Sequence, residues 1–343
     1  MEQAWAELAS PRWLDSARAI YELLPFQRYR QLPFVDVLYD PLREEHWADA
    51  ARVADFVSWL PSSEEGWRPR VLDLGPGDGW PSIPLAATRA DVRVVGLEPS
   101  PRRTRVSFKN ARRLGIANAE FVTGDATAVP LAEGSIDLVT ASYSLEEAAD
   151  PVAAMREVRR VLQPGGAFRI AYQRWELPEP ELEGVSFLEG VSGLLFQYAR
   201  RVQQPSVERR YTLLVPACGP AEAIHREALI AAADAPRVLG ETRLDAASEL
   251  GVGLLERLAP FALDSLAVEL GRWTTDELIA DLEGVGFSEV WGTLHSGERG
   301  RAYGRERIAS GDSFGLDEFD ALTREIGERA AATDGAGMVT ARC

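Results

Sequence analysis

The chain has 343 residues, of which 46% are apolar and 26% charged, and its formal net charge is −16. This length fits one large domain or two small ones with ordinary globular cores. Two cysteines and three scattered histidines exclude a disulfide scaffold and a Cys/His zinc module, so no metal is expected. The acidic balance argues against nucleic acid as a partner, because phosphate neutralisation dominates such binding. The start at Met1 shows no signal peptide, and no apolar run reaches the ~18 residues of a membrane helix, so we expect a cytoplasmic protein without membrane insertion.

The first part of the chain, residues 1–65, is rich in aromatic side chains and is interrupted by Pro25, Pro33 and Pro41. Because proline removes a helix donor, we expect several short helices here rather than one long one. The polar stretch at residues 62–66 is predicted to be a linker. We therefore predict an N-terminal helical lid over residues 1–65, with Tyr39 near the ligand.

From residue 66 the pattern changes to short apolar runs separated by helical stretches. Helices are expected over 81–88, from the Ser100–Pro101 cap and first turn, and over 152–162. Strands that alternate with helices predict a parallel sheet covered on both faces. The five expected strands are 71–74, 92–97, 120–123, 136–141 and 167–172.

Residues 176–271 interrupt this rhythm and are predicted to be a mainly helical insertion after the fifth strand. Helices are expected over 184–201, 221–233 and 246–258, with one strand over 210–215. The alternation then resumes with a helix whose capping box is Thr274 and Glu277. It continues with a sixth strand over 287–294, a polar loop over 296–315, a helix over 316–331 and a seventh strand over 337–341.

The clearest motif is the glycine-rich turn after the first strand. Gly75, Gly77 and Gly79 follow Asp73 in the spacing G-x-G-x-G, whereas dinucleotide sites use G-x-G-x-x-G. Glycines allow a sharp turn and a close approach of ligand to backbone. A carboxylate at this place suits an ammonium or ribose group better than a pyrophosphate.

Two further acids end the next two strands. Glu98 is placed to accept hydrogen bonds from ribose hydroxyls, and Asp125 from an adenine amino group. Ligands of open α/β sheets bind at the carboxyl ends of the strands, so the three acids predict an adenosyl site.

This set of motifs, with residues 94–100, 124–126, 135–143 and 158–166, resembles class I S-adenosylmethionine-dependent methyltransferases, in the small-molecule branch related to ubiquinone and menaquinone biosynthesis. The resemblance covers residues 66–175 and 272–343, taken as the methyltransferase core, and leaves 176–271 as an inserted substrate or lid region. It implies a doubly wound, seven-stranded, mostly parallel Rossmann-like sheet whose last strand is antiparallel. It also implies S-adenosylmethionine as cofactor, held by residues of the glycine turn and the strand ends: Asp73, Gly75, Gly77, Gly79, Glu98, Pro99, Asp125, Ala126 and Ser142.

Catalytic candidates follow from the same resemblance and from residue chemistry. Tyr143 would face the reactive methyl, and relatives often carry His-His where this chain has Glu146 and Glu147. If a base is needed, Glu146, Tyr143, His295 and His225 are the candidates.

We predict methyl transfer to a small or medium, hydrophobic organic acceptor by in-line displacement. Aminopropyl transfer, and a non-catalytic protein that keeps the cofactor pocket, stay open as alternatives. The acceptor and the oligomeric state do not follow from the sequence. The acceptor pocket is expected to be lined by aromatic and apolar residues of the insertion and the N-terminal segment, namely Phe187, Leu195, Phe196, Tyr198, Tyr211, Trp13, Tyr21 and Phe34.

Overall fold

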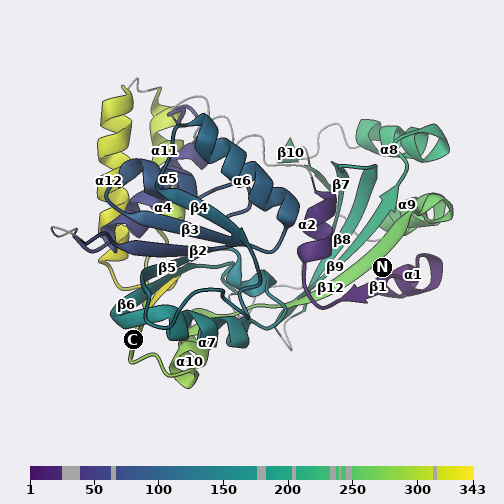
Figure 1. Cartoon of the computed structure of the whole chain (residues 1–343). Coiled ribbons are helices and arrows are strands. Elements are labelled where there is room, and N and C mark those ends of the chain that lie inside the picture. The colour runs from purple at the N-terminus through teal and green to yellow at the C-terminus, as the bar shows by residue number, and fades with distance from the viewer. Residues whose placement is uncertain are drawn as a thin grey trace. The chain divides into compact units, whose positions relative to one another are not determined.

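A computed structural model of the chain describes residues 1–24, 39–62, 67–175, 183–202, 206–231, 237–238, 241–244, 249–311 and 315–343 (Figure 1). Its contacts divide the chain into two compact units. Unit one comprises Met1–Gln27 and Trp175–Arg272, and unit two comprises Arg28–Arg174 and Trp273–Cys343. No helix within the described ranges has both the length and the apolarity to cross a membrane.

Unit two is built on a seven-stranded sheet with the order β13-β14-β6-β5-β2-β3-β4 (Figure 1). The pairs among β6, β5, β2, β3 and β4 are parallel, and β14 is antiparallel to both β6 and β13. This confirms the expected mostly parallel sheet with an antiparallel last strand. The strands are β2 (Arg70–Leu74), β3 (Arg93–Glu98), β4 (Ala119–Thr123), β5 (Ile136–Ser142), β6 (Leu162–Ala171), β13 (Glu289–Thr293) and β14 (Met338–Arg342).

Helices cover both faces of this sheet, because successive strand residues point to opposite sides. Val71 and Leu138 pack with apolar residues of α4 and α5, while their neighbours Leu72 and Val139 pack with those of α7 and α10. The helices of unit two are α4 (Glu44–Ser58), α5 (Ser82–Thr88), α6 (Pro101–Arg113), α7 (Pro151–Val161), α10 (Thr275–Gly284), α11 (Ser296–Ser310) and α12 (Leu316–Ala331), with a 3-10 turn at Leu145–Glu147.

The expected polar loop over 296–315 is wrong for most of its length, because residues 296–310 form α11. Its polar composition hid a glycine face at helical spacing. Gly300 and Gly304 lie so close to Trp47 of α4 that a Cβ on either would clash with it. Small residues at positions four apart thus allow two helices to pack closely.

A buried ion pair joins α4 to the centre of the sheet. Arg169 of β6 donates two hydrogen bonds, of 2.8 and 2.7 Å, to the Asp55 carboxylate, and both side chains are fully buried. Thr340 and Thr293 accept further hydrogen bonds from the same guanidinium. The charge is therefore paired and hydrogen-bonded, as a buried charge must be.

Unit one is a mainly antiparallel sheet with the order β1-β12-β9-β8-β7-β11-β10. Helices α1, α8 and α9 bury one face of it around Trp5, Leu255 and Ile224. The helical prediction for residues 184–201 is wrong, because these residues form the hairpin β7–β8, turning at Gly190 and Gly193. The elements are α1 (Glu2–Leu8), β1 (Arg12–Leu14), α2 (Arg18–Leu23), β7 (Glu183–Glu189), β8 (Leu194–Val202), β9 (Val207–Val215), α8 (Gly219–Ala231), β10 (Arg237–Val238), β11 (Glu241–Leu244), α9 (Glu249–Leu258) and β12 (Asp264–Gly271).

The N-terminal segment does not form the single piece expected over residues 1–65. Residues 1–27 belong to unit one, where β1 pairs with β12, and α4 belongs to unit two. Among the aromatic residues proposed there, Phe34 lies outside the described residues. Trp13 is 54% exposed and stacks edge-on against Tyr211 within unit one.

Candidate functional site

The glycine turn after β2 has the backbone conformation that only glycine adopts readily. Gly75, Gly77 and Gly79 all have positive φ, at +66°, +58° and +112°. A Cβ on Gly75 would lie 2.6 Å from the Cβ of Ser144, and one on Gly79 would clash with Ile83. At Gly77 a Cβ would meet only Arg103, at 3.7 Å, so Gly77 is the position with open space beside it.

Helix α6 holds this turn through one polar face that sequence reasoning missed. Ser107 Oγ donates to the Gly77 carbonyl at 2.9 Å, and Asn110 Nδ2 donates to the Asp78 carbonyl at 2.9 Å. Arg103 pairs with the Asp78 carboxylate at 3.2 Å, and both side chains are buried. Residues 103, 107 and 110 follow the i, i+4, i+7 spacing of one helix face, a signal that the sequence did contain.

Glu98, at the end of β3, closes the turn from the other side. Its two carboxylate oxygens accept the backbone N–H groups of Gly77, at 2.9 Å, and of Ser100, at 3.0 Å. Burial raises the pKa of Glu98 to about 7, although the two backbone hydrogen bonds and the positive charge of Arg103 act to lower it. Each oxygen keeps a lone pair for a second donor.

Asp73 lies beneath the turn and is fully buried. It accepts hydrogen bonds from the hydroxyls of Ser82, at 2.5 Å, and Thr140, at 3.0 Å, and so links β2, α5 and β5. Burial raises the pKa of this carboxyl to about 7.

The third predicted acid, Asp125, is exposed just after β4. Its carboxylate accepts the backbone N–H of Thr127 at 2.9 Å and the hydroxyl of the same residue at 2.8 Å. Ala126 packs at the border of the core, and Pro99 is half-buried after β3. These residues follow neighbouring parallel strands, so they lie at one edge of the sheet.

The structure brings together two catalytic candidates that are 152 residues apart. Tyr143, after β5, has φ +55° and places its hydroxyl 2.7 Å from His295 Nε2, and the two rings stack. His295 precedes α11, and its Nδ1 accepts the Glu298 N–H at 3.2 Å as the helix cap. The neutral ring therefore carries its proton on Nε2 and donates it to the Tyr143 oxygen, which leaves the phenol proton for another acceptor.

His295 is held in this neutral form by its surroundings. Burial, then the positive charges of Arg52 and Arg169, lower the pKa of His295 to about 3. Arg52 of α4, which pairs with Asp49, lies over the rings of Tyr143 and Trp80, at 5.0 and 4.5 Å from their centroids. Arg52 and Trp80 were not expected here, because nothing in their local sequence marks them.

The remaining candidates lie in other surroundings. Glu146 is buried and accepts the Gln173 N–H at 2.9 Å. His225 lies in α8 of unit one, edge-on to Phe187. Among the proposed pocket residues of the insertion, the apolar cluster of unit one contains Phe187, Phe196, Tyr198 and Tyr211, and Leu195 is also buried.

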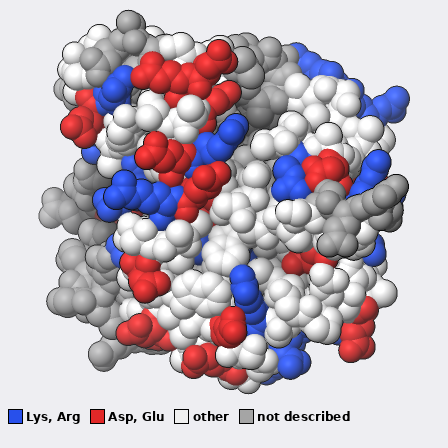
Figure 2. Space-filling view, turned by 90° about the vertical axis from the view of Figure 1, so that its left-hand side faces the viewer, with Lys and Arg blue, Asp and Glu red and all other residues white. Residues whose placement is uncertain are grey.

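No candidate metal centre is seen in the part of the chain that the structure describes. No three His, Cys, Asp or Glu side chains gather there as metal ligands would. On the face shown in Figure 2, acidic and basic side chains are interspersed.

The comparison with protein families identifies the core of this site. Residues 72–170, from β2 to β6, match the family model described as a methyltransferase domain. This part of the chain is similar to methyltransferase domains. The match spans the glycine turn, Glu98, Asp125 and Tyr143 and confirms the resemblance predicted from these motifs.

Curated relatives of the methyltransferase domain share only part of their length with this chain. An uncharacterized methyltransferase of Mycobacterium sp. (strain KMS) is 34% identical over 126 residues, which are 37% of this chain and 47% of that protein. A demethylmenaquinone methyltransferase of Renibacterium salmoninarum is 40% identical over 119 residues, 35% of this chain and 45% of that protein. The chain thus spans about half the length of the curated relatives it matches.

Among solved structures, the cyclase SpnF aligns with 85% of this chain and 80% of its own at 20% identity, with a TM-score of 0.44. A chain of the complex between the Haloferax volcanii Trm112 methyltransferase activator and the putative methyltransferase aligns with 96% of both chains at 18% identity, with a TM-score of 0.43.

Proposed function

We propose that this protein transfers a methyl group from S-adenosylmethionine to a small organic acceptor. The observation that carries the proposal is the glycine turn closed by Glu98: three positive-φ glycines face a buried carboxylate at the carboxyl end of a parallel sheet. Such edges are where open α/β sheets bind ligands. The bound cofactor would supply a sulfonium methyl that is already activated for displacement.

The residues at this edge fit an adenosyl ligand in three respects. Each Glu98 oxygen accepts a single backbone N–H and so keeps acceptor capacity for a hydroxyl donor, and Gly77 leaves space for a ligand against its backbone. Within the described residues, the Ser142 hydroxyl at the end of β5 is buried without a hydrogen-bond partner, so it offers a polar contact to a bound group. Asp73 acts by positioning the turn, because its oxygens are bonded to Ser82 and Thr140.

Tyr143 is assigned to the acceptor. With His295 donating to its oxygen, the Tyr143 hydroxyl donates its proton to an oxygen or nitrogen of the acceptor and orients it. His295 serves as a positioning residue and not as a base, because its pKa of about 3 keeps it neutral and its Nδ1 lone pair caps α11.

The acceptor is proposed to be a small or medium, hydrophobic organic molecule, and one relative is named a demethylmenaquinone methyltransferase. Unit one is proposed to serve acceptor selection, because its main segment leaves the core after β6, a parallel strand whose carboxyl end lies at the edge of the glycine turn. Removing both segments of unit one, by deleting residues 1–27 and replacing residues 176–271 with a short linker, should then preserve cofactor affinity and abolish methyl transfer.

Cofactor binding is the first test. Calorimetry with S-adenosylmethionine should show binding by the wild type and a loss of about ten- to a hundredfold for Glu98→Gln. Glu120→Gln, an exposed carboxylate on β4, is the matched control and should bind as the wild type does. Equal affinity of all three proteins would refute the assignment of Glu98.

A turnover assay distinguishes methyl transfer from aminopropyl transfer and from a non-catalytic protein. Incubation with S-adenosylmethionine and a panel of quinols, phenols, thiols and amines should release S-adenosylhomocysteine with at least one acceptor. Preference for the decarboxylated cofactor, with release of methylthioadenosine, would instead show aminopropyl transfer. Tight cofactor binding without turnover of any acceptor would favour the non-catalytic alternative.

A further inference from the structure

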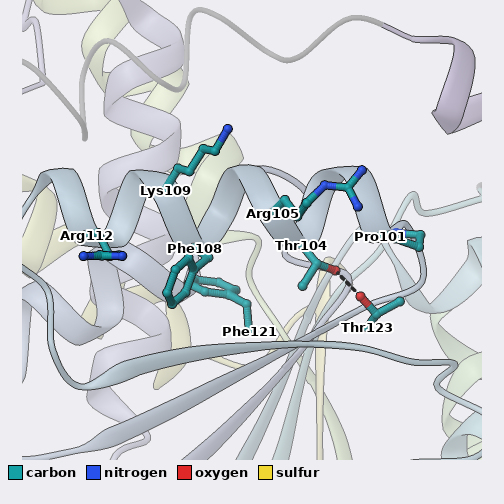
Figure 3. A pocket seen from close by; sticks show the side chains of 8 residues that line it. All are labelled: Pro101, Thr104, Arg105, Phe108, Lys109, Arg112, Phe121 and Thr123. Atoms are coloured by element: carbon teal, nitrogen blue, oxygen red, sulfur yellow. Dashed lines mark hydrogen bonds between the residues drawn. The ribbon is translucent and has the colours of Figure 1, made fainter.

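A surface groove runs between α6 and β4 at one edge of the unit-two sheet (Figure 3). Its volume is about 680 Å³. Phe108 of α6 and Phe121 of β4 lie side by side at its floor, and Arg105 and Lys109 point away from the strand (Figure 3). The groove is lined by Pro101, Thr104, Arg105, Phe108, Lys109, Arg112, Phe121 and Thr123.

The lining combines an apolar floor with positive charge. Arg105, Lys109 and Arg112 follow the i, i+4, i+7 spacing of one helix face, and no lining residue is acidic. No carboxylate within the described ranges pairs with any of the three, although Arg112 lies over the Phe108 ring at 5.6 Å. The groove is therefore positively charged, although the whole chain has a net charge of −16.

The strand beside the groove has backbone groups that face outward. β4 is the last strand of its sheet and pairs only with β3 among the described strands. The Asn118 carbonyl and the Gly124 N–H both bond to β3, so the even-numbered residues between them point their backbone groups inward. The N–H and C=O groups of Ala119, Phe121 and Thr123 therefore point away from the sheet, and no other described strand pairs with them.

We propose that the groove binds an extended acidic segment of a partner protein, which adds to β4 as an eighth strand. Its backbone would pair with the outward groups of Phe121 and Thr123, and every second side chain would enter the groove. Arg105 and Arg112 are about 10 Å apart along α6, and three alternate strand residues span about 13 Å, so carboxylates at alternate positions match the spacing of the cations. A leucine between them would cover Phe108, which is 51% exposed.

Charge favours this occupant over two others. A second copy paired through the same edge would bring two sets of these cations together, which is repulsive. Nucleic acid would have to approach a chain with a large negative net charge, and three cations neutralise few phosphates.

The experiment uses the whole protein and a fluorescein-labelled peptide that alternates threonine with glutamate and carries one central leucine. Fluorescence anisotropy should show binding that weakens as salt is added. The double variant Arg105→Glu/Arg112→Glu should bind at least about tenfold more weakly. Arg113→Glu, on the same helix but outside the groove, is the matched control and should bind as the wild type does.

Lys109 provides an independent readout, because it is the only lysine in the sequence. An acetylating reagent therefore reacts with one side-chain amine, whose rate mass spectrometry can follow. Peptide at ten times its dissociation constant should slow acetylation of Lys109 about tenfold.

Four outcomes would overturn the proposal. The first is no binding at millimolar peptide, and the second is equal binding of a peptide with lysine in place of glutamate. The third is unchanged affinity of a peptide N-methylated at alternate residues, since strand pairing needs those amides. The fourth is a wild-type dimer that the double variant dissociates, which would make a second copy the occupant. None of these measurements depends on cofactor binding, so they test the groove separately from the proposed methyl transfer.

Discussion

Replacing Glu98 by glutamine separates a ligand-binding role from a structural one, because the two roles predict opposite changes. The carboxylate pKa is raised by burial from 4.5 to about 7, so the folded protein keeps a proton that the unfolded chain releases. The unfolding free energy of the wild type therefore falls as pH rises from about 4.5 to about 7 and then levels off. The shift corresponds to an upper limit of about 3 kcal/mol for this one group.

Glutamine removes this pH-dependent contribution and introduces a local defect. The NH2 of the glutamine amide faces the backbone N–H of Gly77 or Ser100, so one hydrogen bond is lost. This loss lowers the free energy of unfolding by about 1–3 kcal/mol at every pH. At about pH 5 the variant should have a lower free energy of unfolding than the wild type. At about pH 8 its free energy of unfolding should equal or exceed that of the wild type. Affinity for S-adenosylmethionine should nevertheless fall about ten- to a hundredfold at the higher pH, because two charge-assisted hydrogen bonds are lost.

Urea unfolding and calorimetry at the two pH values check both parts. A variant that loses stability equally at both pH values would refute the buried, raised-pKa carboxylate. A variant that is as stable as the wild type at the higher pH and still binds the cofactor with full affinity would refute its contact with the ribose.

Three further predictions rest on other contacts. His295 should show an Nε2–H tautomer and no titration between about pH 5 and 8 in ¹⁵N NMR spectra, since its pKa of about 3 lies below that range; a titrating ring would contradict its positioning role. Gly75→Ala should lower the melting temperature more than Gly77→Ala does. A Cβ fits at position 77, so only the left-handed φ destabilises that variant, by about 1–2 kcal/mol; the reverse order would contradict the packing of the turn. Asp55→Ala leaves the buried Arg169 charge unpaired and should destabilise unit two by about 3–5 kcal/mol, measured by thermal unfolding, whereas a loss below about 1 kcal/mol would show that water reaches the guanidinium.

Much of the core was predictable because its signals are local. The strands near residues 71, 94 and 138 are short apolar runs, and the glycine spacing after the first of them requires a turn whatever surrounds it. The caps at Ser100 and Thr274 also formed as predicted, because a cap needs only the hydroxyl and the backbone N–H three residues on.

Where prediction failed, the deciding contact was distant in the sequence. Residues 184–201 have apolar side chains that suit a helix or a strand, and pairing with β9 and β11 decided for strands. Residues 296–310 are too polar to indicate a buried helix, and Trp47, some 250 residues earlier, supplies the surface that their glycines fit.

The sequence by itself determined the mostly parallel α/β core of unit two, because apolar periodicity, glycine spacing and strand-end acids act through the backbone of a few neighbouring residues. Only the tertiary structure decided which side chains meet: it paired Tyr143 with His295, buried Arg103 against Asp78, and left Arg105 and Arg112 of the same helix in an open groove. The physical reason is that burial and hydrogen-bond partners depend on groups brought together from distant parts of the chain, and these set the charge and proton position that local sequence leaves undetermined.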